Sequence, residues 1–207
     1  MLPLYDFDLR QYIRRCPLTE SVARKLSGDV CQAVCFIHAK SILHRDIKPT
    51  NILVQRQPLA AILSDFGCSV SLSSPPSSTI TPDMCTFWYR APEIMLTHSQ
   101  YSFPSDVWSL GVSCIEMEHG ECPFTESSEV RLMRVILTTL GVPDDHRRLD
   151  LCTKLAVGSV GSSRPITAQV WGHRFGEHFS AFVKRAVCVL ASRRARAAQL
   201  CIGAWLA

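Results

Sequence analysis

The sequence predicts a mainly α fold of the α+β class, helical with a few short β-strands. Apolar residues recur at helical spacing from Leu18 to Lys40 and in the run "SSEVRLMRVILTTLG", whereas "SILHRD", "NILVQ" and "AAILSDF" are short β-rich pieces. The chain has 207 residues, of which 47% are hydrophobic and 19% charged. Such a chain is long and apolar enough to build one core, so we expect a single domain.

The elements are expected in a simple order along the chain. An extended piece runs through Pro3 and leads into a short helix, and the half-buried helix from Leu18 to Lys40 follows. The short strands come next, and the Ser/Pro-rich stretch 69–82 is expected to be a loop without regular structure. A buried central helix opens with a Ser or Asp cap at 105–106, the next helix ends at Gly141, and the last thirty residues are again helical.

Charge and cysteine usage argue against several classes of protein. The net charge of +4 is small for a dedicated nucleic-acid binder, so no nucleic-acid partner is expected. The ten cysteines include no CxxC pair, which favours free thiols in a reducing compartment, cytoplasmic or nuclear, over disulfides or a zinc site. No apolar run reaches the roughly 18 residues of a membrane span, so no membrane partner is expected.

The stretch "LHRDIKPTNIL" at 43–53 carries the residues with the clearest chemistry. Asp46 is followed by Lys48 and Asn51, and Asp65 stands further on in "SDFG" after an apolar strand. Phosphoryl transfer needs a base that orients the acceptor, oxygen ligands for a divalent metal, and a cation near the developing charge. Asp46 fits the base, Asn51 and Asp65 fit Mg²⁺ ligands, and Lys48 fits the cation. The alternative is that both aspartates are solvated loop carboxylates.

The order and spacing of "HRDIKPTN", "DFG" and "APE" resemble the catalytic loop, metal loop and activation-segment end of eukaryotic protein kinases. "TFWYRAPEIML" followed by "SDVWSLG" is similar to the cyclin-dependent kinase group in particular. This resemblance implies a serine/threonine kinase that uses ATP and Mg²⁺ and is directed to proline. Thr86 and Arg90 would then belong to the substrate pocket.

The same resemblance implies structural and regulatory roles. Asp106 would hydrogen-bond the backbone of the catalytic loop, and Glu93 would pair with Arg194, although Leu190 and Ala191 stand where the family has Asp-Pro. By its spacing before "WYRAPE", Thr81 falls on the regulatory phosphothreonine, whose phosphate would pair with Arg45. The alternative is that Thr81 merely belongs to a Ser/Thr-rich loop.

The resemblance covers the larger, C-terminal lobe of a kinase, so 1–207 is expected to be a partial kinase domain. Residues 1–7 match a hinge remnant and 8–207 the C-terminal lobe, with 144–180 poorly matched. Three residues would contact ATP: Tyr5 on the hinge, Asp8 near the ribose and Leu53 beneath the adenine. The sequence contains no G-x-G-x-x-G loop and no V-A-I-K lysine, which hold the phosphates in this family.

Three readings of function remain open. In the first, the chain derives from a protein kinase, here as a truncated gene model or a splice product. In the second it is a short non-catalytic binding module, and in the third it is an inactive fragment that never folds stably. Protein substrates are the expected partners, with a cyclin-like activator in a full-length form. Because the phosphate-covering loop is missing from the sequence, we expect this chain alone to label substrate no more than its Asp46→Asn variant.

Overall fold

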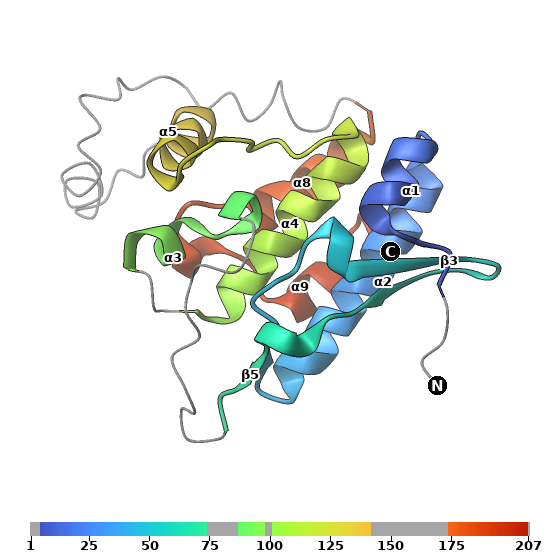
Figure 1. The fold of residues 1–207 in the computed structure, drawn as a ribbon, viewed down its shortest axis with the longest axis horizontal. Helices are drawn as coiled ribbons and strands as arrows, with labels where there is room; N and C mark the ends of the chain where they lie inside the picture. Colours follow the sequence, from blue (N-terminus) through green and yellow to red (C-terminus); the bar gives the residue numbers. More distant parts are fainter. Residues whose placement is uncertain (1–4, 74–86, 98–100, 142–173, 207) are drawn as a thin grey trace.

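The computed structural model describes residues 5–73, 87–97, 101–141 and 174–206 (Figure 1). Its α-helices are α1 (Leu9–Arg15), α2 (Glu20–Ala39), α3 (Pro92–Thr97), α4 (Phe103–His119), α5 (Glu129–Leu140), α8 (Gly176–Ala186) and α9 (Ala197–Cys201). Short 3₁₀ turns are η1 (Pro49–Asn51), η2 (Phe66–Cys68), η4 (Phe87–Tyr89) and η5 (Ala191–Arg193). The described chain is therefore mainly helical, as the apolar periodicity predicts.

Within the described residues, five short strands form two small antiparallel sheets. The strands are β1 (Phe7–Asp8), β2 (Ile42–Leu43), β3 (Ile52–Arg56), β4 (Leu59–Leu63) and β5 (Val70–Ser71). One sheet has the order β1-β3-β4, and in the other β2 pairs with β5. In the β3–β4 hairpin Ile52 lies opposite Leu63, so the residues that flank the hairpin, Asn51 and Ser64, come together at its base.

The core is built around α2 and α4, which lie in the middle of the molecule (Figure 1). Helix α2 packs against β4, α9 and α4, while α4 also packs against α8. At Gly111 an added Cβ would lie 2.5 Å from Cγ2 of Val187, so the close approach of α4 and the end of α8 requires glycine. Trp108 and Trp205 are fully buried; Trp108 stacks on Phe124, and Trp205 packs against Phe179 of α8.

Three expectations about elements need correction. The stretch 69–82 includes a strand, β5, because Val70 pairs with Leu43. Helix α4 begins at Phe103 instead of at the Ser105–Asp106 cap; the Ser105 side chain accepts a hydrogen bond from the Ser102 N–H (2.8 Å), and Asp106 accepts one from the Arg45 N–H. The C-terminal residues are not one helix, because the chain leaves α8 at Ala186 and re-enters a helix only at Ala197.

Among the described residues, no helix combines the length and the apolar character that crossing a membrane requires.

Candidate active site

The loop 44–51 follows β2 and is held in place by helix α4. The Asp106 carboxylate is buried and accepts hydrogen bonds from the backbone N–H groups of His44 and Arg45, both at 2.9 Å. Its Oδ2 is also 2.9 Å from Nε2 of His38. Arg45 adopts a left-handed backbone conformation (φ 68°) that costs a non-glycine residue roughly 1–3 kcal/mol. The two bonds to Asp106 hold the loop in this strained turn.

The turn presents Asp46 to two neighbours that share one of its oxygens. Oδ2 of Asp46 accepts hydrogen bonds from Nζ of Lys48 and from Nδ2 of Asn51, both at 2.8 Å. Nδ2 of Asn51 also donates to the backbone oxygen of Asp46 (2.9 Å), which uses both of its protons. Within the described residues, Oδ1 of Asp46 accepts no hydrogen bond, so one carboxylate oxygen is held in place and the other is available.

Asp65 follows Ser64, which is hydrogen-bonded to Asn51 across the base of the hairpin. Both the backbone N–H and the hydroxyl of Ser64 donate to the backbone oxygen of Asn51, at 2.9 and 2.8 Å, and Asp65 is the next residue. Asp65 is exposed and left-handed (φ 61°), and its Oδ1 accepts from the Gly67 N–H at 3.3 Å. The amide oxygen of Asn51 and the carboxylate of Asp65 are hard oxygen donors of the kind that suits Mg²⁺.

His44 joins the two loops through its imidazole. The ring is fully buried, its Nε2 lies 3.0 Å from the backbone oxygen of Ser64, and its Nδ1 accepts from the Asp46 N–H at 3.3 Å. These partners require the neutral tautomer with the proton on Nε2. Burial lowers the pKa of His44 below its ordinary value of 6.5, although Asp106 pulls that pKa the other way.

We expect acidification to destabilise the protein through His44. The folded state holds this ring neutral, so between its lowered pKa and 6.5 only the unfolded state takes up the proton. The contribution to stability is present above pH 6.5 and is lost as the pH falls below it, by at most about 1.4 kcal/mol per pH unit. Urea unfolding of the wild type, of His44→Gln and of His178→Gln between pH 7.5 and 5.5 checks this. Only His44→Gln should flatten the profile, since His178 is exposed; equal slopes in all three proteins would contradict it.

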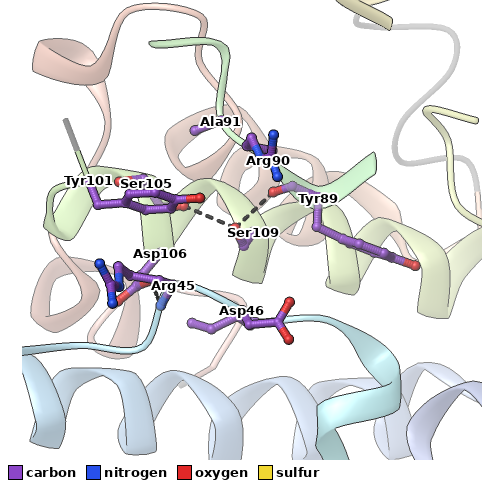
Figure 2. A pocket seen from close by; sticks show the side chains of 10 residues that line it. Arg45, Asp46, Tyr89, Arg90, Ala91, Tyr101, Ser105, Asp106 and Ser109 are labelled. Atoms are coloured by element: carbon purple, nitrogen blue, oxygen red, sulfur yellow. Dashed lines mark hydrogen bonds between the residues drawn. The ribbon is translucent and has the colours of Figure 1, made fainter. Parts of the chain in front are cut away.

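A small pocket of about 20 Å³, room for about one water molecule, opens beside the loop 44–51 (Figure 2). Arg45 and Asp46 form one side, and Tyr89, Arg90 and Ala91 lie across from them. Nη2 of Arg45 is buried and has no hydrogen-bond partner among the described residues, while Nε of Arg45 donates to the Cys68 backbone oxygen (2.6 Å). The pocket thus combines an available carboxylate oxygen with a buried, unpartnered cationic donor.

The far side of the pocket is anchored by two groups of side chains. Arg90 forms an ion pair with Glu129 at the start of α5. The buried hydroxyl of Tyr89 donates to Glu116, and Arg10 of α1 contacts both, with 3.3 Å between its Nε and Oε1 of Glu116. Burial raises the pKa of the Tyr89 hydroxyl, with Cys122 and Glu116 adding to the effect, so this hydroxyl stays protonated and donating.

Glu93 and Arg194 form a bidentate ion pair. Nη1 and Nη2 of Arg194 each lie 2.6 Å from a different Glu93 oxygen. The guanidinium also donates to the backbone oxygens of Pro104, Cys188 and Val189, and its carbon lies 5.0 Å from the centre of the Trp108 ring. The pair ties the first turn of α3 to the chain between α8 and α9.

The residues expected to contact ATP are only partly brought together. Asp8 and Leu53 are register partners in the β1–β3 pair, and Oδ1 of Asp8 caps α1 by accepting from the Gln11 N–H at 2.8 Å. Tyr5 is half-buried just before β1. The residues expected to be regulatory and substrate-binding, Thr81 and Thr86, lie outside the described residues.

The sequence did not predict several residues of the candidate site. Glu129 and the Arg10–Tyr89–Glu116 group carry no local motif, because their partners lie on other elements. A signal did exist for Glu116, a carboxylate in the largely apolar run 107–117, since a buried charge needs a partner. His44 had one as well, as a titratable residue directly after the apolar Ile42 and Leu43.

Comparison with known proteins gives evidence that does not depend on the geometry of the site. The chain matches a family model described as a protein kinase domain over residues 4–206. It is 38% identical over 141 residues to a probable CTD kinase subunit alpha homolog of Encephalitozoon cuniculi (68% of this chain, 42% of the relative). A probable cell division protein kinase of that organism is 33% identical over 178 residues (86% and 56%), and cyclin-dependent kinase B2-1 of Oryza sativa subsp. japonica is 35% identical over 148 residues (68% and 44%). The chain spans about half the length of these relatives.

Proposed function

This chain belongs to the protein kinase family, and on that premise we propose that it carries the catalytic and substrate-binding part of a cyclin-dependent-like serine/threonine kinase. The observation that carries the proposal is the Asp46 carboxylate. One of its oxygens is held by Lys48 and Asn51, and the other is available beside a pocket. The reaction would transfer a phosphoryl group from ATP to a serine or threonine of a protein.

In this proposal Asp46 orients the acceptor hydroxyl and accepts its proton through Oδ1. The bonds from Lys48 and Asn51 to Oδ2 fix the carboxylate, so little motion is needed before reaction. Lys48 also places a positive charge beside the site where the phosphoryl group arrives. His44 keeps the loop backbone in register by accepting from the Asp46 N–H.

The oxygen donors next to Asp46 suit the cofactors of the family. We propose that the amide oxygen of Asn51 and the carboxylate of Asp65 hold Mg²⁺, which when bound neutralises charge on the phosphates of ATP. Tyr5, Asp8 and Leu53 would contact the nucleoside, with residues 1–7 as the hinge and 8–207 as the larger lobe. The neighbouring positions of Asp8 and Leu53 in the β1–β3 pair support this assignment.

We propose that Arg90 and Thr86 favour proline after the phosphorylated residue. The ion pair with Glu129 keeps the Arg90 side chain in a fixed position at the pocket. Arg90→Ala is expected to reduce a preference of about tenfold or more for a Ser-Pro over a Ser-Ala peptide to near unity. The preference is measured as the ratio of kcat/KM values of the chain joined behind the glycine-rich loop and lysine-bearing strand of an active protein kinase. Glu129→Gln should shift the ratio in the same direction. An unchanged ratio in both variants would contradict the proposed role.

We propose further that phosphorylated Thr81 pairs with Arg45. The buried, unpartnered Nη2 of Arg45 supports this, since a phosphate offers strong acceptors to such a donor. A charge-assisted hydrogen bond of about 1.5–3 kcal/mol should raise Tm by roughly 3–10 °C when Thr81 is phosphorylated. Scanning calorimetry of phosphorylated and unmodified protein checks this, and the difference should vanish in Arg45→Gln. A rise that persists in Arg45→Gln would assign the phosphate to another partner.

The test of the function compares two polypeptides. The first is the 207-residue chain, and the second is the same chain joined behind the glycine-rich loop and lysine-bearing strand of an active protein kinase. With labelled Mg²⁺·ATP and a Ser-Pro peptide, we expect labelling by the second that Asp46→Asn abolishes, and none above that control by the first. If both polypeptides are folded and neither labels the peptide, the result would favour the alternative, a non-catalytic binding module or inactive fragment.

We also propose the binding partners of the protein and its location in the cell. Protein substrates, and a cyclin-like activator in the whole protein, are the partners that the relatives suggest, one of which is named a cyclin-dependent kinase. A cytoplasmic or nuclear location fits the reduced thiols, as the eight cysteines within the described residues are all free.

A further inference from the structure

Two thiols face each other where α2 packs against α9. Cys31 lies in the middle of α2 and is completely buried, while Cys201 is the last residue of α9 and is partly exposed. Their sulfur atoms are 3.2 Å apart, although 170 residues separate them in the chain. The Cys31 thiol also donates to the Ala197 backbone oxygen in the first turn of α9, at 3.6 Å. Both side chains therefore point into one contact between the two helices.

The two sulfur atoms need to move only a short distance to form a disulfide bond. A disulfide has an S–S length of about 2.05 Å, so the sulfurs must approach by roughly 1 Å. Cys201 can supply this movement because the helix ends there and the next residue, Ile202, is 83% exposed. Cys31, in contrast, is fixed by the helix on both sides.

We propose that Cys31 and Cys201 form an intramolecular disulfide when the protein is exposed to a peroxide. Hydrogen peroxide oxidises the Cys201 thiol to a sulfenic acid and releases one water molecule. The Cys31 thiol then attacks that sulfur, the S–S bond forms, and the sulfenic oxygen leaves as a second water molecule. Two thiols are oxidised and one peroxide is reduced, and this modification does not depend on the proposed kinase activity.

The surroundings of the two sulfurs set the order of events. Burial raises the pKa of both thiols. Cys201 is partly exposed whereas Cys31 is completely buried, so the oxidant reaches Cys201 first. The competitor is Cys35, which lies one turn further along α2 and also interacts with the Cys201 thiol. Cys31 is the favoured partner because its sulfur is already in contact with that of Cys201.

The bond would constrain the unfolded chain across most of its length. Closing so long a loop removes conformational freedom from the unfolded state, which stabilises the folded one. For a chain of this size we expect oxidation to raise Tm by roughly 5–15 °C. It would also fix α9 to α2, close to the chain that carries Arg194 toward Glu93.

Peptide mapping of the full chain after hydrogen peroxide treatment tests the proposal. Unreacted thiols are alkylated, and trypsin then releases residues 26–40, with Cys31 and Cys35, and the peptide that begins at Ala197, with Cys201. We expect these two peptides linked, with a loss of two hydrogens and two titratable thiols, and a higher Tm that dithiothreitol reverses.

Variants assign the bond to its two residues. Cys35→Ala and the exposed control Cys16→Ala should keep the link and the rise in Tm, while Cys31→Ala and Cys201→Ala should lose both. If Cys31→Ala does not fold, fragment ions of the linked wild-type peptide locate the sulfur within 26–40. A link through Cys35 or any other cysteine, a bond only between two chains, or no loss of paired thiols would overturn the proposal.

Discussion

Arg194→Leu is expected to lower the free energy of unfolding by about 3 kcal/mol, the lower end of what breaking a buried ion pair costs. The Arg194 side chain is fully buried, and its loss leaves the Glu93 carboxylate without the two bonds that compensate its partial burial. Glu93 is 23% exposed, so water takes over part of that compensation. The backbone oxygens of Pro104, Cys188 and Val189 lose a donor as well. Urea unfolding followed by circular dichroism measures the change.

Two variants make this result specific to the ion pair. Arg193→Leu removes the same charge one residue earlier, where the side chain is exposed, and should leave the unfolding midpoint nearly unchanged. In the double variant Glu93→Gln/Arg194→Leu no buried charge remains without its partner, so part of the stability should return. A loss in Arg194→Leu no greater than in Arg193→Leu would show that the pair contributes little.

Asp46→Asn is expected to lower the rate of phosphoryl transfer by about 10²–10⁴-fold, the usual contribution of a positioned base. The amide keeps the size of the side chain but loses the charge that binds Nζ of Lys48 and accepts the proton. The joined polypeptide described above, with labelled Mg²⁺·ATP and a Ser-Pro peptide, provides the measurement.

The control for this variant is Glu121→Gln, which neutralises an exposed carboxylate just beyond α4. That substitution should leave the rate within about twofold of the wild type, because a screened surface charge acts weakly at a distance. Equal melting temperatures of the two variants would separate a chemical effect from unfolding. A rate that survives in Asp46→Asn would remove Asp46 from the proposed mechanism.

The local part of the candidate site could be predicted from the sequence, because its chemistry is concentrated in a few adjacent positions. Asp46, Lys48 and Asn51 lie within one turn of chain, and the apolar strand before Asp65 indicates where the second loop begins. The distant contacts could not be predicted in the same way. Arg10 and Glu116 are 106 residues apart, and their charges alone do not indicate that they pair.

The sequence predicts the elements in which apolar residues repeat over many residues, and it does not predict the short ones. Helix α2 repeats its apolar positions over five turns, so its limits lie close to the predicted ones. Strand β5 has two residues and exists only because β2 lies beside it, which no local pattern reveals. Helix α4 accepts Pro104 in its first turn, where a missing N–H costs little, so the helix begins two residues before the predicted cap at Ser105.

The contact between α2 and α9 has a consequence for synthesis on the ribosome. Residues 170 positions apart must meet there, and at ordinary translation speeds roughly 10–30 s pass between the emergence of the two helices. During that interval the apolar side of α2 that packs against α9, including Cys31, is not yet buried by α9. The nascent chain should therefore depend on chaperones until translation reaches α9.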